Sequence, residues 1–91
     1  MHLVVVADDV AEFLWAMDEK SRRVCKRNLA KLSRPYPGRG IGDKERIVVD
    51  GQELYRLHIG RTYTAFYVIG KDVVRVIELL PIDAAHKKYG P

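Results

Sequence analysis

The sequence has little of three features that define larger or more specialised proteins: length, cysteine and long apolar runs. It has 91 residues and one cysteine, Cys25, so no disulfide can form within the chain. No apolar run approaches the roughly 20 residues that a membrane helix needs. The apolar stretch at residues 3–7 is too short for a signal peptide, and no cleavage-site pattern follows it. We therefore expect a cytoplasmic protein that is not bound to a membrane.

Metal-binding patterns are also missing. The three histidines, His2, His58 and His86, do not combine with Cys25 at a spacing typical of metal ligands. We therefore expect no metal and no other cofactor. Cys25 stands beside Val24 in a helical pattern, which indicates a buried structural thiol rather than a reactive one.

The composition is that of an ordinary globular chain, with 47% hydrophobic and 31% charged residues. It lacks the low hydrophobicity and high charge of a disordered protein. A chain this short forms one domain over residues 1–91 and buries only a modest core. Its stability is therefore expected to be marginal unless a partner adds buried surface.

Charge is distributed unevenly along the chain. Residues 20–46 contain ten basic residues and only two acidic ones, Asp43 and Glu45, a net charge of +8. The other segments carry six basic and ten acidic residues, a net charge of −4. A concentrated basic segment favours a polyanionic partner such as RNA or the ribosome. The alternative is a solvated helix face with no ligand.

The first residues predict a strand followed by an amphipathic helix. Residues 2–6 form a short β-branched run, which is typical of a strand with neighbours or covered faces. Asp8 or Asp9 is positioned to cap the helix that follows. Four apolar residues then keep the spacing of one helical face: Val10, Phe13, Leu14 and Met17.

A second helix is predicted over about residues 19–33, opened by Asp18. One stripe along it consists of small and apolar residues, namely Ser21, Val24, Cys25, Leu29 and Leu32. Basic residues fill most of the remainder, namely Arg22, Arg23, Lys26, Arg27 and Lys31. The two helices therefore form a hairpin with an apolar side toward a sheet and a basic side outward.

The rest of the chain predicts a sheet. Two prolines and three glycines make residues 34–43 a loop, and strands are expected at 46–49, 53–59, 62–69 and 73–80. Asp50-Gly51 is a strong signal for a two-residue hairpin turn, and Pro81 ends the last strand. The order is β-α-α-β-β-β-β. The predicted fold is α+β, with two N-terminal helices packed on a twisted, mainly antiparallel sheet.

Several local motifs, in this order, carry a resemblance to a known family. The most distinctive is the segment 54–60, LYRLHIG, followed by Tyr63 and Tyr67. Asp50-Gly51 stands before that strand, residues 73–80 with Pro81 form the last strand, and a helical hairpin precedes them all. Together these motifs resemble the RelE/ParE toxin superfamily over nearly the whole chain, and archaeal RelE-like toxins in particular.

The resemblance implies a single RelE/ParE-like toxin domain of a type II toxin–antitoxin system. RelE-type members cut mRNA on the ribosome and so inhibit translation, whereas ParE-type members inhibit DNA gyrase. Members of both types are silenced by a cognate antitoxin that wraps around the toxin. The chain departs from the RelE pattern at Thr64 and Ile82, where the family often has arginine.

Cleavage of RNA by its own 2′-hydroxyl needs a base, an acid and cations that stabilise the charge on phosphorus. Histidine suits either proton role near neutral pH, and arginine can only hold charge. The candidate catalytic residues are Arg56, His58, Arg61, His86 and Tyr89. The candidate RNA- or ribosome-binding residues are Arg22, Arg23, Lys26, Arg27, Lys31, Arg34 and Arg39. Tyr89 or Tyr36 is suited to stacking on a base.

Arg56 and His58 are separated by one residue, so they share one face of their strand. We expect this face to be uncovered and both side chains to point to solvent. A polar strip on an uncovered sheet face would look the same in a protein that is not an enzyme. Three functions therefore remain open: a ribosome-dependent mRNA endonuclease, a non-catalytic ParE-like gyrase inhibitor, and a non-toxic member of the fold that binds a partner.

Overall fold

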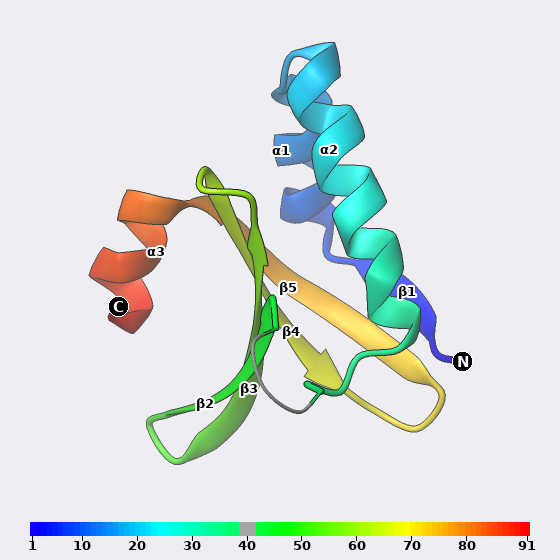
Figure 1. Ribbon diagram of the computed structural model, residues 1–91, viewed down its shortest axis with the longest axis vertical. Helices are drawn as coiled ribbons and strands as arrows, with labels where there is room; N and C mark the ends of the chain where they lie inside the picture. Colours follow the sequence, from blue (N-terminus) through cyan, green and yellow to red (C-terminus); the bar gives the residue numbers. More distant parts are fainter. Residues whose placement is uncertain (39–41) are drawn as a thin grey trace.

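The chain forms a five-stranded sheet with helices on both of its faces (Figure 1). The computed structural model describes residues 1–38 and 42–91. The elements follow in the order β1 (Leu3–Val6), α1 (Asp8–Ala16), α2 (Glu19–Ala30), a 3₁₀ turn (Lys31–Ser33), β2 (Lys44–Val49), β3 (Gln52–Ile59), β4 (Tyr63–Ile69), β5 (Val73–Pro81) and α3 (Ile82–Tyr89). The α+β class expected from the sequence is confirmed.

The strand order in the sheet is β1-β5-β4-β3-β2. The pairs β2–β3, β3–β4 and β4–β5 are antiparallel, whereas β1 runs parallel to β5. The sheet is therefore mainly antiparallel, as predicted. The parallel pair brings the first strand beside the last one, Leu3 opposite Val73.

One face of the sheet packs against α1 and α2 to form the core. Its buried side chains include Val10 and Leu14 from α1, Cys25 and Leu29 from α2, Leu32, Tyr55, Leu57, Ile59, Ala65, Tyr67, Val74, Val76 and Leu79. The Tyr67 hydroxyl is satisfied in this core because it donates a hydrogen bond of 2.7 Å to the Pro35 carbonyl. Across residues 1–38 and 42–91, none of the helices combines the length and apolar character needed to cross a membrane.

The starts of the two N-terminal helices differ in how well the sequence predicted them. Asp18 caps α2 as expected, because its carboxylate accepts a 3.1 Å hydrogen bond from the Ser21 N–H. The Ser21 hydroxyl and this N–H both hydrogen-bond the carboxylate and lower the pKa of Asp18. The expected cap of α1 was wrong: Ala7 is the N-cap, and Asp8 and Asp9 lie in the first turn. There their charges face the positive end of the helix dipole.

The hairpin turn predicted at Asp50-Gly51 is confirmed. Both residues have positive φ angles, 51° and 79°, which is the backbone of a type I′ turn. The turn sets the register in which Val49 faces Gln52, and β2 and β3 stay paired as far as Lys44 and Leu57.

The expected order contained no helix after residue 81, and this was wrong. β5 continues to Pro81, which pairs with Tyr63 and also serves as the N-cap of α3. In α3 the least exposed residues, Ile82, Ala85 and Tyr89, recur at i, i+3 and i+7 and so share one side. Figure 1 shows α3 on the side of the sheet away from α1 and α2. This added helix covers the surface on which the candidate catalytic residues were placed.

Candidate functional site

The sheet face opposite α1 and α2 carries the candidate catalytic residues of β3. Arg56 lies opposite Phe66, and His58 lies opposite Thr64. The predicted alternation is confirmed, since Tyr55, Leu57 and Ile59 belong to the core on the other face. We call this second surface, defined by Arg56, His58, Thr64, Phe66 and Glu78, the α3 face.

Arg56 does not point to solvent, so that expectation was wrong. Its guanidinium forms an ion pair with Glu45, the residue opposite it on β2, and the side chain is only 12% exposed. It also donates hydrogen bonds to the carbonyl oxygens of Gly90, at 3.5 Å, and Pro91, at 3.0 Å. The reason is α3, which brings the end of the chain back over this face. The charge of Arg56 is therefore already matched by an acidic partner.

Tyr89 is brought to the same place as Arg56. Its ring packs on Phe66, with ring centroids 4.1 Å apart and planes tilted by 32°. Burial raises the pKa of Tyr89, and the nearby Glu78 carboxylate raises it further. The phenol therefore stays protonated at neutral pH and is suited to donating a hydrogen bond. Its packing on Phe66 occupies ring surface that a stacked base would use.

Two acidic residues of this face, Glu45 and Glu78, were missed by the sequence reasoning. One carboxylate oxygen of Glu78 binds the Lys88 ammonium, which raises the pKa of Lys88. The other, Oε2, is buried with no hydrogen-bond partner among the described residues. A β-bulge explains why the pattern concealed Glu78: Phe66 pairs with Glu78, but Tyr67 pairs with Val76. Strict alternation from Val76 would have placed Glu78 in the core instead.

Of the remaining candidate catalytic residues, only His58 belongs to the α3 face, and in the part of the chain that the structure describes none of them contacts Arg56 through a polar bond. His58 is half-buried, Arg61 is exposed in the turn between β3 and β4, and His86 is exposed on α3. Among the described residues, no hydrogen bond or ion pair joins these three side chains to Arg56 or Tyr89. Within residues 1–38 and 42–91, no group of three His, Cys, Asp or Glu side chains could hold a metal ion.

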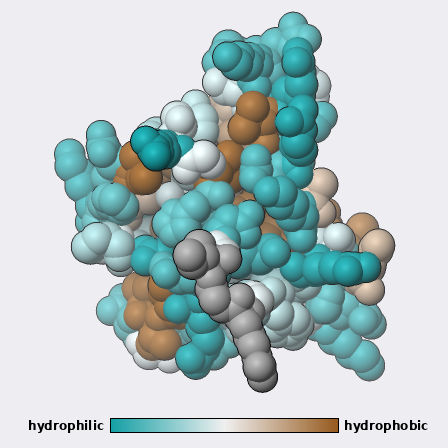
Figure 2. All heavy atoms as spheres, viewed as in Figure 1, coloured by the Kyte–Doolittle hydropathy of each residue, from teal (hydrophilic) through white to brown (hydrophobic). Residues whose placement is uncertain are grey.

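The predicted basic side of α2 is present, and Figure 2 shows a hydrophilic surface over this helix. Arg22, however, has a structural task that the sequence did not reveal. Its guanidinium donates to the carbonyl oxygens at the end of α1: Leu14 at 3.0 Å, Trp15 at 3.2 Å and Met17 at 2.7 Å. It thereby satisfies carbonyls that a helix end leaves without partners. These contacts occupy donors that a polyanion would otherwise use.

Several of the other predicted binding residues are accessible to a ligand. Lys26, Arg27 and Arg34 are exposed, and Arg23 forms an exposed i,i+4 pair with Glu19 at 3.5 Å. Such a pair contributes little to stability, so Arg23 can exchange Glu19 for a phosphate. Arg39 lies outside the described residues.

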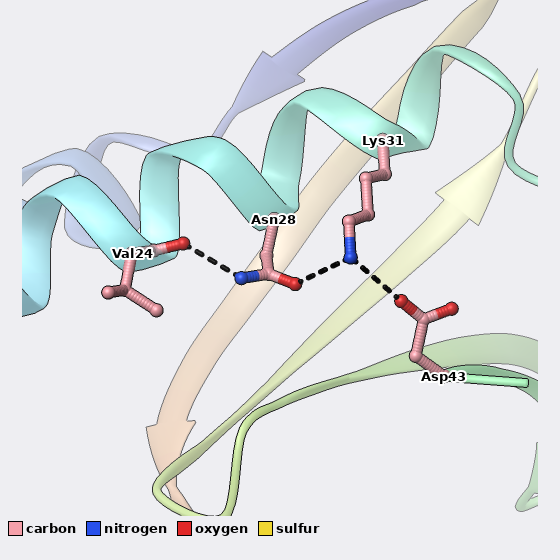
Figure 3. A network of polar contacts seen from close by, with 4 residues as sticks. All are labelled: Val24, Asn28, Lys31 and Asp43. Atoms are coloured by element: carbon pink, nitrogen blue, oxygen red, sulfur yellow. Dashed lines mark hydrogen bonds and ion pairs between the residues drawn. The ribbon is translucent and has the colours of Figure 1, made fainter.

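Lys31 belongs to a chain of polar contacts at the end of α2 (Figure 3). Its ammonium donates to the Asn28 side-chain oxygen at 3.1 Å and forms an ion pair with Asp43 at 3.4 Å. Asn28 in turn donates to the Val24 carbonyl at 2.9 Å. Lys31 therefore ties α2 to the segment that enters β2, which leaves its charge partly neutralised.

The comparison with solved structures identifies the fold. No protein-family model matches the sequence, and no curated protein matches it. The structure is similar to the archaeal RelE–RelB complex from Pyrococcus horikoshii, with 20% identity, a TM-score of 0.69 and coverage of 88% of this chain and 93% of that one.

Two further solved structures extend the likeness. The RelB–RelE complex from Methanococcus jannaschii shows 15% identity and a TM-score of 0.65, over 93% of this chain and 98% of that one. The isolated RelE toxin of E. coli shows 17% identity and a TM-score of 0.58, over 97% and 98%. The chain therefore has the fold of RelE toxins over nearly its full length.

Proposed function

We propose that the protein is the toxin of a type II toxin–antitoxin pair and that it cleaves mRNA on the ribosome. The observation that supports this most is the α3 face, where a RelE-like sheet gathers Arg56, His58, Glu78 and Tyr89. These are the kinds of group that metal-free cleavage by the 2′-hydroxyl needs: proton carriers and a cation.

In this proposal His58 takes or returns a proton at the scissile phosphate, and His86 supplies the second proton carrier. Arg56 and Arg61 stabilise the charge that develops on phosphorus. Arg56 can do so by exchanging the Gly90 and Pro91 carbonyls for phosphate oxygens, because both are hydrogen-bond acceptors for the same guanidinium. Tyr89 is the remaining candidate at this site, as a hydrogen-bond donor, because its ring already packs on Phe66.

A cognate antitoxin is the partner that we propose, since two of the similar structures are complexes of RelE with RelB. Two apolar surfaces are suited to such a segment. Leu3 and Val6 are exposed along the edge strand β1. A hollow of about 310 Å³ lies between α2 and the β3–β4 turn, lined by Lys20, Ser21, Val24, Ile59, Gly60, Thr62 and Tyr63. We place both proteins in the cytoplasm with the ribosome.

The test is cleavage of ribosome-bound mRNA by the wild type and by His58→Ala. We expect His58→Ala to lower the cleavage rate by roughly 10²-fold or more, the usual size of a general acid–base contribution. The matched control is His2→Ala, a histidine that packs edge-on against Tyr36 away from the α3 face. Circular dichroism checks that both variants fold. Full activity in folded His58→Ala would exclude its role in proton transfer.

One observation favours a second candidate, a non-catalytic ParE-like inhibitor of DNA gyrase. Arg56 is paired with Glu45, and Thr64 and Ile82 stand where RelE-type enzymes often have arginine. A face with so little free positive charge could bind a target without cleaving RNA. Inhibition of gyrase supercoiling, with no mRNA cleavage under any ribosomal condition, would establish this alternative. If neither gyrase inhibition nor mRNA cleavage were found, the remaining function would be that of a partner-binding protein without toxicity.

A further inference from the structure

Trp15, the only tryptophan of the chain, is unusually exposed for such a large apolar side chain. It lies at the end of α1, and 73% of it is accessible to solvent. Tryptophan is normally among the more buried residues, because its ring carries a large apolar surface. The Trp15 ring is not packed in the core of the protein, so the ring is available to a ligand.

The indole is flanked by a guanidinium that is itself held in place. The central carbon of the Arg22 guanidinium lies 5.1 Å from the centre of the Trp15 ring, within the range of a cation–π contact. The three hydrogen bonds from Arg22 to the end of α1 fix this guanidinium. Trp15 therefore projects from a rigid support rather than from a freely moving chain end.

A basic hollow adjoins this aromatic platform. It has a volume of about 280 Å³ and is lined by Glu19, Arg22, Arg23 and Lys26. Three of these four side chains are cationic, and the single carboxylate is engaged with Arg23. Because Arg22 contacts the Trp15 ring and also lines the hollow, the aromatic surface and the positive charge are contiguous.

We propose that Trp15 stacks on an unpaired base of single-stranded RNA while Arg23 and Lys26 bind the adjoining phosphates. Arg22 acts as a positioning residue that holds the ring. This surface is built from α1 and α2, across the sheet from the α3 face (Figure 1). The proposal thus adds a second RNA contact to the proposed function and rests on that function only for the choice of RNA.

The chemistry favours a single strand over the other polyanions. Combined aromatic and cationic surfaces bind single strands because every base has a face to stack and every linkage has a phosphate. A duplex satisfies the cations but keeps its bases stacked inside. An acidic peptide also satisfies the cations, yet its carboxylates offer nothing planar and uncharged to cover the indole.

The first experiment uses the fluorescence of Trp15 as a direct reporter, since the chain has no other tryptophan. The probes are an RNA octamer of adenylate, a duplex RNA of the same length, and polyglutamate. We expect saturable quenching by the single strand and little quenching by the duplex or by polyglutamate. Binding of the single strand without quenching, or equal quenching by polyglutamate, would overturn the proposal.

The second experiment measures binding of the labelled octamer to variants by fluorescence anisotropy. Trp15→Ala should weaken binding about tenfold or more, and Trp15→Phe, which keeps a ring, should weaken it less. Lys26→Gln should weaken binding and reduce the slope of log affinity against log salt by about 0.7. Two controls should leave binding unchanged: Val48→Ala, another exposed apolar residue, and Lys71→Gln, an exposed lysine in the β4–β5 turn.

Equal binding by Trp15→Ala and the wild type would overturn the stacking role. Because these measurements use free RNA and no ribosome, they do not depend on cleavage. Quenching without mRNA cleavage would support this contact and count against the proposed endonuclease. Cleavage of mRNA without quenching of Trp15 would support the proposed endonuclease and count against this contact.

Discussion

At the scale of single residues, Arg56 is subject to two competing demands. Its contacts with Glu45 and with the carbonyls of Gly90 and Pro91 hold β2, β3 and the end of the chain together. The proposed chemistry instead needs the same guanidinium at a phosphate. Sequence alternation correctly placed Arg56 on the face away from the core. It could not show that a later helix would cover that face, because this depends on tertiary packing.

Replacing Arg56 by alanine should therefore destabilise the protein. Glu45 would lose its cation and the chain-end carbonyls would lose a donor, so we expect the free energy of unfolding to fall by about 1–3 kcal/mol. Urea unfolding measures this change. Arg75→Ala on β5, an exposed arginine, is the control and should change stability by less than about 0.5 kcal/mol. Equal stability of Arg56→Ala and the wild type would contradict the observed contacts.

Cys25 gives the protein a dependence on alkaline pH. Burial raises the pKa of its thiol from 9.0 to about 11. Below pH 9 the thiol is protonated in both folded and unfolded chains, so the full stability is present. As the pH rises from 9 to 11, the unfolded chain ionises first. At about 1.4 kcal/mol per pH unit, this should remove about 2–3 kcal/mol of stability across that interval.

The measurement is urea unfolding at a series of pH values, for the wild type and for Cys25→Ala. The variant loses packing at every pH, but its stability should fall less steeply between pH 9 and pH 11. Tyrosine ionisation contributes in the same range and is common to both proteins. Parallel curves for the two proteins would show that the Cys25 thiol does not titrate as described.

At the scale of elements, the sequence predicted best those whose determinants are local. The apolar period of α1, the Asp18 cap of α2 and the Asp50-Gly51 turn depend on residues within a few positions of each other. The β5 bulge depends on how β5 meets β4, and no local pattern reveals it. The burial of α3 depends likewise on a sheet face formed by distant residues.

The β2–β3 turn offers a test of this locality. Gly51→Val should destabilise the protein by about 1–3 kcal/mol, because a β-branched residue is strained at φ 79°. Added bulk is not the cause, since an added Cβ at Gly51 meets nothing within 4 Å. Gly38 has the same free space without a positive φ, so Gly38→Val is the matched control and should be nearly neutral. Thermal unfolding compares the two variants, and equal losses would argue against backbone strain.

At the scale of the whole molecule, the small core makes the protein responsive to a partner. A ligand that binds only the folded state adds about 2.7 kcal/mol at 100 times its dissociation constant. For a domain of this size we expect the proposed antitoxin to raise Tm by roughly 10–20 °C at that concentration. Thermal denaturation with and without the antitoxin tests this, and a scrambled peptide of equal charge is the control. An unchanged Tm would contradict the proposed pairing.

The parallel pairing of β1 with β5 affects the order in which the nascent protein can fold. β1 is synthesised before its partner residues, which begin about 70 positions later, at Val73. At about 5–20 residues per second, the ribosome needs roughly 4–14 s to add them. During that time the β-branched strand has no neighbour and exposes backbone groups that another chain could pair with. Pairing of β1 must therefore wait until β5 has been synthesised, which makes β1 a segment that molecular chaperones would need to shield.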